Sequence, residues 1–253
     1  MTTDVLLPVS MAVAAGLIGC FAVMRRMALA ADALSHVALP GIGVAIALHI
    51  HPLVGAAAML FFGALLVWGL EEATRVPVEL VIGVVFSAAL AIGSMITRGE
   101  DLLDALLGHS GTIGWTEAVF GALASAVIIL FVVTQRQRLV VALISPDIAR
   151  TAGVNVRRLN AVYLQMFALT IALGLRYFGV LLMGSLLIIP AATAMRLSRN
   201  LTSMLVTAAV LAAAATVAGT ALAPLLHRDP GPVIVTISAV GFFASLAVRR
   251  PAR

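Results

Sequence analysis

The 253-residue sequence contains no lysine, a single cysteine and few charged residues of any kind. Because Cys20 is alone, the chain has neither an intrachain disulfide nor a cysteine-rich metal site. Without lysine, it lacks the side chain with which a Walker-type loop reaches nucleotide phosphates, so ATP hydrolysis by that route is excluded. Charged residues make up only 11% of the chain, which is too few for the surface of a soluble domain of this size.

Apolar residues fill most of the chain instead, at 62% hydrophobic content and a mean hydropathy of +1.13. Nine apolar segments approach the length that spans a membrane. The first lacks the basic region and cleavage site of a signal peptide, so we keep it as a span. We predict an all-α polytopic membrane bundle of about eight to nine transmembrane helices, forming a single domain over residues 1–253. The segments are 5–23, 27–48, 53–70, 78–97, 117–134, 159–176, 179–194, 201–222 and 232–248.

The sixteen arginines test this arrangement, because arginine-rich loops of membrane proteins are typically cytoplasmic. Nine alternating spans place 13 arginines on one side and 3 on the other. We therefore predict an outside N-terminus and a cytoplasmic C-terminus, and we attribute the basic residues to topology rather than to nucleic-acid binding. The larger set is Arg25, Arg26, Arg75, Arg136, Arg138, Arg150, Arg157, Arg158, Arg196, Arg199, Arg249, Arg250 and Arg253; the smaller is Arg98, Arg176 and Arg228.

Asp32 and His36 lie in the second apolar segment, within the stretch AADALSHVALPG at 30–41. Residues four apart share one face of a helix. An ionisable side chain near mid-membrane costs about 2.5–3.5 kcal/mol, so such groups usually have a partner or line a wet cavity. A carboxylate and an imidazole suit a divalent transition metal such as zinc or manganese. A hydrogen bond between them that only ties helices together is an open alternative, because two ligands do not saturate a metal.

Pro40 follows His36 by four residues and has no N–H to bond the carbonyl of His36. The sequence therefore predicts a kink beside the candidate pair. Gly41 and Gly43 after the kink allow a neighbouring helix to approach closely.

The other histidines lie at predicted outer ends of the spans. His49 and His51 form a pair that could capture a metal ion on entry, although histidines are common at membrane interfaces without any such role. His109 and His227 lie in outer loops beside acidic residues, which could raise the local concentration of cations.

The stretch SPDIARTAG at 145–153 has the pattern of a short helix. Ser145 is suited to the N-cap, Pro146 to the first helical position, Asp147 to the positive end of the helix dipole and Gly153 to a left-handed closing residue. An ordinary cytoplasmic turn explains the same local pattern. The expected apolar face consists of Ile148, Ala149 and Ala152.

In the stretch at 179–194, Gly184 permits close helix approach and Pro190 predicts a broken or partial span. Most of this stretch is interpreted as a packing helix, with Met183 and Ser185 as candidates to line a path.

Four stretches resemble, in the same order, the permease subunits of bacterial metal-ion ABC importers of the zinc and manganese type. They are DALSHVALPG, PDIARTAGV at 146–154, GVLLMGSLLIIPAATA at 179–194 and PGPVIVTISAVGFFASL at 230–246. The outer stretch LLGHSGTIGW departs from the family at His109. The resemblance implies that Asp32 and His36 take part in metal passage.

The resemblance also implies a transport subunit rather than an enzyme, multi-pass in the bacterial plasma membrane. An extracytoplasmic metal-binding protein would deliver zinc or manganese as cargo, a separate subunit would use ATP, and no permanent cofactor is expected. A homodimer would bring two copies of Asp32 and His36 together. The coupling helix that docks on the ATP-binding subunit is expected at 145–153, through Pro146, Asp147, Ile148, Ala149, Arg150 and Gly153.

Three other classes of function make different demands on the sequence. A gradient-driven secondary carrier would use Asp32 as its titrating group, and an ABC permease for a siderophore or haem would need a wider path. A membrane metalloenzyme would need more ligands, such as an HExxH helix, and the sequence has none. The residues do not choose between zinc and manganese, and import rather than export rests on the resemblance.

Overall fold

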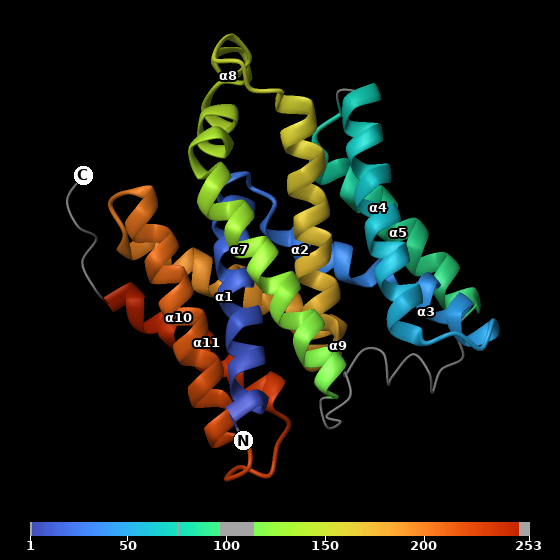
Figure 1. Ribbon diagram of the computed structural model, residues 1–253, viewed down its shortest axis with the longest axis vertical. Coiled ribbons are helices and arrows are strands. Elements are labelled where there is room, and N and C mark those ends of the chain that lie inside the picture. Colours follow the sequence, from blue (N-terminus) through green and yellow to red (C-terminus); the bar gives the residue numbers. More distant parts are fainter. Residues whose placement is uncertain (1, 75, 97–113, 248–253) are drawn as a thin grey trace.

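A computed structural model describes residues 2–74, 76–96 and 114–247, and the regular structure in these ranges is entirely helical (Figure 1). Eight helical segments are long and apolar enough to cross a membrane, and a further one, Leu182–Leu197, is shorter. The predicted all-α polytopic bundle is confirmed. Its described helices are α1 (Thr2–Met24), α2 (Ala28–His36), α3 (Ala38–Ala47), α4 (Pro52–Thr74), α5 (Val78–Ile96), α7 (Trp115–Ile144), α8 (Pro146–Thr151), α9 (Val156–Leu197), α10 (Leu201–Leu222) and α11 (Pro230–Ala247).

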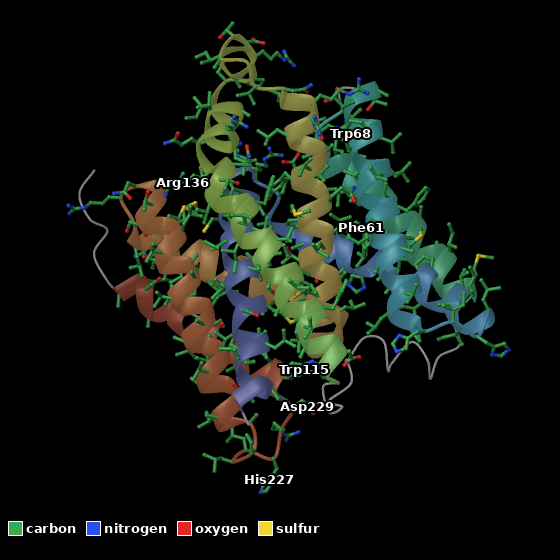
Figure 2. The ribbon with its side chains drawn as sticks, viewed as in Figure 1. Phe61, Trp68, Trp115, Arg136, His227 and Asp229 are labelled. Atoms are coloured by element: carbon green, nitrogen blue, oxygen red, sulfur yellow. The ribbon has the colours of Figure 1, made fainter. Side chains whose placement is uncertain are left out.

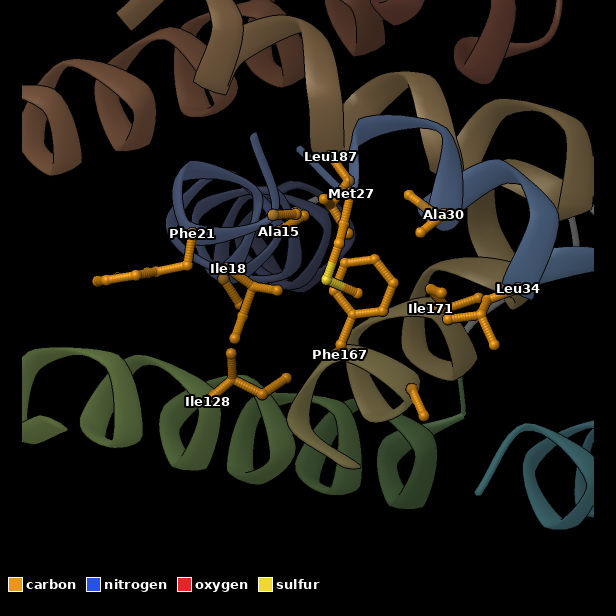
Figure 3. Close-up of a cluster of buried hydrophobic side chains, with 14 of the residues drawn as sticks. Ala15, Ile18, Phe21, Met27, Ala30, Leu34, Ile128, Phe167, Ile171 and Leu187 are labelled. Carbon is orange, nitrogen blue, oxygen red and sulfur yellow. The ribbon is translucent and has the colours of Figure 1, made fainter. Parts of the chain in front are cut away.

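Helix α1 lies at the centre of the packing, against α9, α10 and α7. Its Ile18 and Phe21 are fully buried. Figure 3 shows Ile18 next to Ile128 of α7, with Phe167 and Leu187 of α9 on the other side of the cluster. Lipid provides no hydrophobic drive for helices to associate, so the close van der Waals packing around α1 holds the bundle together.

Helix α9 is 42 residues long and contains both the sixth and the seventh predicted segments. A straight helix of this length would extend about 63 Å, roughly twice the thickness of the hydrocarbon core. The α9 helix is not straight, because Met183 packs against Gly174, nine residues earlier in the chain. In a straight helix these two residues would lie on opposite faces about 13 Å apart along the axis.

Both limbs of α9 return to the same level of α1. In the first limb, the Tyr163 hydroxyl donates to the carbonyl oxygen of Ile18 at 3.4 Å. In the second limb, the carbonyl of Leu187 lies directly against Gly19, the next residue of α1. The helix therefore folds back between Gly174 and Met183, and the second limb is the short span that Pro190 led us to expect.

The second predicted segment is two helices. Helix α2 ends at His36, Val37 forms a turn, and α3 begins at Ala38. The Val37 N–H bonds the Leu34 carbonyl at 3.0 Å, a tighter turn than the α-helix has. The cause is Pro40, which provides no N–H for the His36 carbonyl. The predicted kink beside the candidate pair is confirmed.

Helix α8 forms where the sequence predicted a short helix at 145–153. The Ser145 hydroxyl accepts from the Ile148 N–H at 3.3 Å, and Gly153 closes the helix at φ +79°. Of the predicted apolar face, Ala149 is fully buried against the rest of the chain, whereas Ile148 is 61% exposed and Ala152 is also exposed. The preceding helix α7 continues to Ile144, because the polar residues after position 134 are good helix formers.

The two ends of the molecule differ in charge. Figure 1 shows α8 and the adjoining ends of α4, α7 and α9 at one end, and the N-terminus and the α10–α11 connection at the other. Arginines gather towards the α8 end, while Arg228 lies in the α10–α11 connection. Which end is cytoplasmic remains a prediction from this bias. The described arginines of the α8 end are Arg25, Arg26, Arg136, Arg138, Arg150, Arg157, Arg158, Arg196 and Arg199.

Candidate functional site

Asp32 and His36 lie on α2, which crosses the molecule about half-way along its long axis (Figure 1). One face of α2 packs mainly on α9 and α5. On its other face Asp32 is exposed, Leu29 is 83% exposed, and His36 is half-buried. The structure therefore places both candidate ligands on one face of α2, on the surface of the single chain. The buried face consists of Ala30, Ala31, Leu34 and Ser35.

The Asp32 carboxylate has no hydrogen bond or ion pair with any described residue. Its backbone carbonyl accepts from the Ser35 hydroxyl at 2.6 Å, a contact that leaves the carboxylate free. No hydrogen bond joins Asp32 to His36, whose buried Nδ1 atom has no partner among the described residues. The alternative in which an Asp–His hydrogen bond ties helices together is therefore not what the structure contains.

The His36 ring is positioned by packing. It lies 5.5 Å from the ring of Phe86 on α5, centroid to centroid, with the planes tilted by 55°. A histidine in a permanent metal site usually donates its second N–H to an acceptor that fixes the ring. Since Nδ1 has no such acceptor in the described part of the chain, the ring is held by packing that includes the contact with Phe86.

Gly184 on the second limb of α9 meets α2 at Asp32. A Cβ atom at position 184 would lie 2.9 Å from the Asp32 Cα and 3.0 Å from its backbone nitrogen. Only glycine allows this approach without a shift of one backbone. The close approach predicted for Gly184 thus takes place at the candidate site itself. Met183, beside it, is buried against Gly174 and fills space, and Ser185 is half-buried.

The pair provides only part of a coordination shell. In the described residues no cluster of three or more His, Cys, Asp or Glu side chains could hold a metal ion. Zinc is generally bound by four ligands, and Asp32 and His36 could supply at most two of them from a single chain. A carboxylate that faces lipid at this depth is costly, so the exposed face of α2 calls for water, an ion or another protein surface.

The structure does not bring His49 and His51 near this pair. Both are exposed at the far end of α3, about 15 Å of helix away. His49 adopts φ +56°, and the next N–H, of Ile50, bonds the Ala45 carbonyl at 2.8 Å to close α3. The His51 Nδ1 atom accepts from the Leu53 N–H at 3.3 Å at the start of α4. Each histidine thus has a local role at a helix end.

The remaining histidines are not part of the site. His227 is exposed in the α10–α11 connection, next to Asp229 and at the opposite end from α8 (Figure 2). His109, with the acidic residues Glu100, Asp101 and Asp104, lies outside the described residues.

The residues assigned to the coupling helix form the tip of the arginine-rich end. Asp147 and Arg150 make an exposed ion pair at 3.0 Å. Ile148 and Ile144, 61% and 75% exposed, leave apolar area at this tip, where a buried Ala149 packs the short helix against the rest of the chain. The tip is a small mixed surface that projects beyond the apolar part of α7. Pro146 and Gly153 are also exposed there.

Two contacts of the candidate site were not predicted from the sequence. Phe86 lies in an apolar run with no feature that marks it, and the partner of Gly184 could not be known before α9 was seen to fold back. A pattern of one polar pair within an apolar segment points to candidate ligands, but it does not identify the apolar groups that pack against them.

Comparison with known proteins agrees with this architecture. The chain matches the ABC 3 transport family over residues 1–249. The membrane protein ZnuB of a high-affinity zinc uptake system in Haemophilus influenzae is 30% identical over 92% of this chain and 91% of its own length. The membrane protein YfeD of a chelated iron transport system in Yersinia pestis is 32% identical over 92% of this chain and 80% of its own.

A third relative, the membrane protein MntC of a manganese transport system in Listeria monocytogenes, is 27% identical over 93% of this chain and 85% of its own. Among solved structures, PsaBC of Streptococcus pneumoniae, in complex with a Fab, superposes with a TM-score of 0.83 at 24% identity, covering 98% of this chain and 91% of that one. An inward-facing metal-chelate type ABC transporter gives 0.74 at 18%, covering 95% and 84%. The motifs, the helical bundle and the match over nearly the whole length agree, and the chain belongs to the ABC 3 transport family of metal-transport permeases.

Proposed function

We propose that this chain is the permease of an ATP-driven importer of zinc or manganese ions, which pass Asp32 and His36. The observation that carries the proposal is an exposed, unpaired carboxylate one helical turn from a half-buried imidazole, half-way along the bundle. Such groups are costly in lipid unless an ion or a wet path compensates them. The lack of an acceptor on His36 Nδ1 suits a transit site, since it leaves the metal bond weaker than in a permanent site.

The working unit in this proposal is a homodimer with the exposed face of α2 near its two-fold axis. One chain supplies two side-chain ligands, and a second copy related by the axis would supply two more. The same arrangement would cover Leu29 and remove Asp32 from lipid. The shared site would therefore exist only in the dimer.

The driving subunit in this proposal docks on α8. Exposed Ile148 and the Asp147–Arg150 pair provide an apolar and charged surface outside the membrane. ATP use by that subunit would alternate the access to the site, and a metal-binding protein on the outer side would deliver the ion. Localisation in the bacterial plasma membrane and a cytoplasmic α8 follow from the arginine bias and the family.

The relatives support two candidate cargoes. ZnuB and MntC belong to zinc and manganese systems, which matches an N/O ligand pair. YfeD belongs to a chelated iron system, and the structural similarity to a metal-chelate type transporter supports a chelate as the second candidate. Uptake of bare ions that an excess of preformed chelate fails to reduce would favour the first.

The first prediction concerns Asp32→Asn, which keeps the shape of the side chain and removes its charge. Uptake of radioactive zinc or manganese into vesicles that contain the permease and its ATPase should fall by about a hundredfold, since even outer-shell changes cost 10–100-fold. Glu79→Gln, which neutralises an exposed carboxylate at the start of α5, should retain uptake. Full uptake by the Asp32 variant would show that Asp32 is not part of the transport site. Uptake that persists without ATP would indicate a secondary carrier.

The second prediction concerns the dimer. In a Cys20→Ser background, Leu29→Cys should be cross-linked to its copy by a short bifunctional maleimide, because Leu29 lies beside the proposed axis. Leu130→Cys, at an exposed leucine of α7, is the control and should remain monomeric on a denaturing gel. If only the control were cross-linked, the two-fold axis would not lie near α2.

A further inference from the structure

An open cavity of about 440 Å³ lies between α7 and the start of α9, directly below α8. Figure 1 shows these two helices side by side beneath α8. The cavity has a polar upper part and an apolar floor made by Phe131, Leu159 and Val162. Its polar part consists of Gln135, Arg138, Asn155 and Arg158.

The two arginines of this cavity carry uncompensated charge. No carboxylate lines the cavity, and within the described residues neither guanidinium is in an ion pair. Arg138 has only a neutral contact, to Gln135 at 3.2 Å. The adjacent Arg157 differs: it pairs with Glu72 at 3.6 Å and stacks on Trp68. Arg138 and Arg158 thus form an anion-attracting site that the chain itself does not neutralise.

The depth of the cavity matches the headgroup region of a bilayer. The apolar stretch of helix α7 lies between Glu117 and Arg136, which are about 28 Å apart along the helix, and Trp115, 75% exposed, lies just before it. This is close to the thickness of a hydrocarbon core, and exposed tryptophans are typical of its boundary. Arg138 therefore lies just beyond the boundary at the opposite face, while Val127 and Leu130, 50% and 64% exposed, lie on the lipid side.

We infer that this cavity binds the phosphate group of an anionic phospholipid. Arg138 and Arg158 would hold the phosphate, Gln135 and Asn155 would bond the glycerol or headgroup, and the acyl chains would lie along the exposed face of α7. Basic pockets between helices at the cytoplasmic boundary are suited to such lipids. Since Gly153 and Val154 also line the cavity, a bound lipid would brace the α8–α9 connection. The inference does not depend on Asp32 or on the transported ion.

The test measures lipid retention by the full-length protein, purified with any subunit that accompanies it. Native mass spectrometry would count phosphatidylglycerol molecules retained after titration with that lipid, by wild type and by the Arg138→Gln/Arg158→Gln double variant. The double variant should bind at least tenfold more weakly, because each arginine near the surface contributes substantially to anionic lipid attraction. Phosphatidylcholine should not compete, and raising the salt concentration should weaken retention.

Arg136→Gln is the matched control, because Arg136 is at the same end of α7 (Figure 2) and does not line the cavity. It should retain phosphatidylglycerol as wild type does. The inference would be overturned if the double variant retained as much phosphatidylglycerol as wild type, or if millimolar inorganic phosphate displaced the lipid. It would also be overturned if the double variant lost a bound ATPase and not the lipid. Each variant's unfolding transition, measured in the same detergent, separates loss of the site from loss of the fold.

Discussion

The mid-membrane pair and the contacts around Arg25 at the arginine-rich end are two polar regions of the described structure, and they differ in whether their side chains have partners. At the arginine-rich end, Arg25 donates to the Asn160 side chain at 2.7 Å and lies 4.4 Å from the centre of the Tyr163 ring. In the middle of the bundle, the Asp32 carboxylate and the His36 Nδ1 atom have no polar partner among the residues that the structure describes.

This difference distinguishes polar groups that stabilise the fold from polar groups that are candidates for a function. A buried polar group that finds a partner stabilises the fold modestly, whereas one without a partner costs free energy that something else must offset. The network at the arginine-rich end joins α1 and α4 to the first limb of α9. The pair on α2 makes no side-chain hydrogen bond or ion pair with the described residues, which is why a ligand and a second copy are proposed there.

Among the variants that test this comparison, Gly184→Ala is expected to have the largest effect. The added Cβ would collide with the Asp32 backbone, so α2 or α9 must move, at a cost of about 1–3 kcal/mol. Metal uptake should fall at least tenfold because Asp32 is displaced. Gly241→Ala, where a Cβ meets nothing within 4 Å, is the control for uptake and for unfolding in mixed micelles. Normal uptake by the Gly184 variant would show that the position of α2 does not matter.

An intermediate effect, on stability and not on uptake, is expected from Arg25→Gln. Loss of the contacts with Asn160 and Tyr163 should lower the free energy of unfolding by about 1–2 kcal/mol. Uptake per folded molecule should stay near wild type. The neighbouring, exposed Arg26, replaced by Gln, should change neither quantity. If Arg25→Gln stopped uptake in fully folded protein, the arginine-rich end would have a transport role beyond support.

The smallest effect is expected from Phe86→Leu. The ring that orients His36 is lost, so metal affinity of the purified transporter should fall about two- to fivefold, as expected for one aromatic contact. Stability should change little because leucine fills most of the space. Phe62→Leu, at an exposed phenylalanine of α4, is the matched control. An equal loss of affinity in both variants would mean that the contact with His36 does not position the ring.

The sequence was most informative where structure depends on neighbours in the chain. The four-residue spacing of Asp32 and His36, the break caused by Pro40 and the caps at Ser145 and Gly153 are local, since helix geometry and backbone hydrogen bonds decide them. The number of spans followed from hydropathy for the same reason. Local reasoning could not tell which residues of the predicted apolar face are buried, Ala149 rather than Ile148, because that depends on how α8 packs on α7.

The sequence alone thus determined that the chain crosses a membrane many times and that one acidic and one imidazole group share a helix face inside it. Only the tertiary structure decided that α9 folds back on itself, that Gly184 touches Asp32, and that Phe86 holds His36. The physical reason is distance along the chain. Helical periodicity acts over four residues, whereas the contacts of Phe86 with His36 and of Gly184 with Asp32 join residues 50 and 152 positions apart. Many apolar sequences are compatible with either a straight or a folded-back α9.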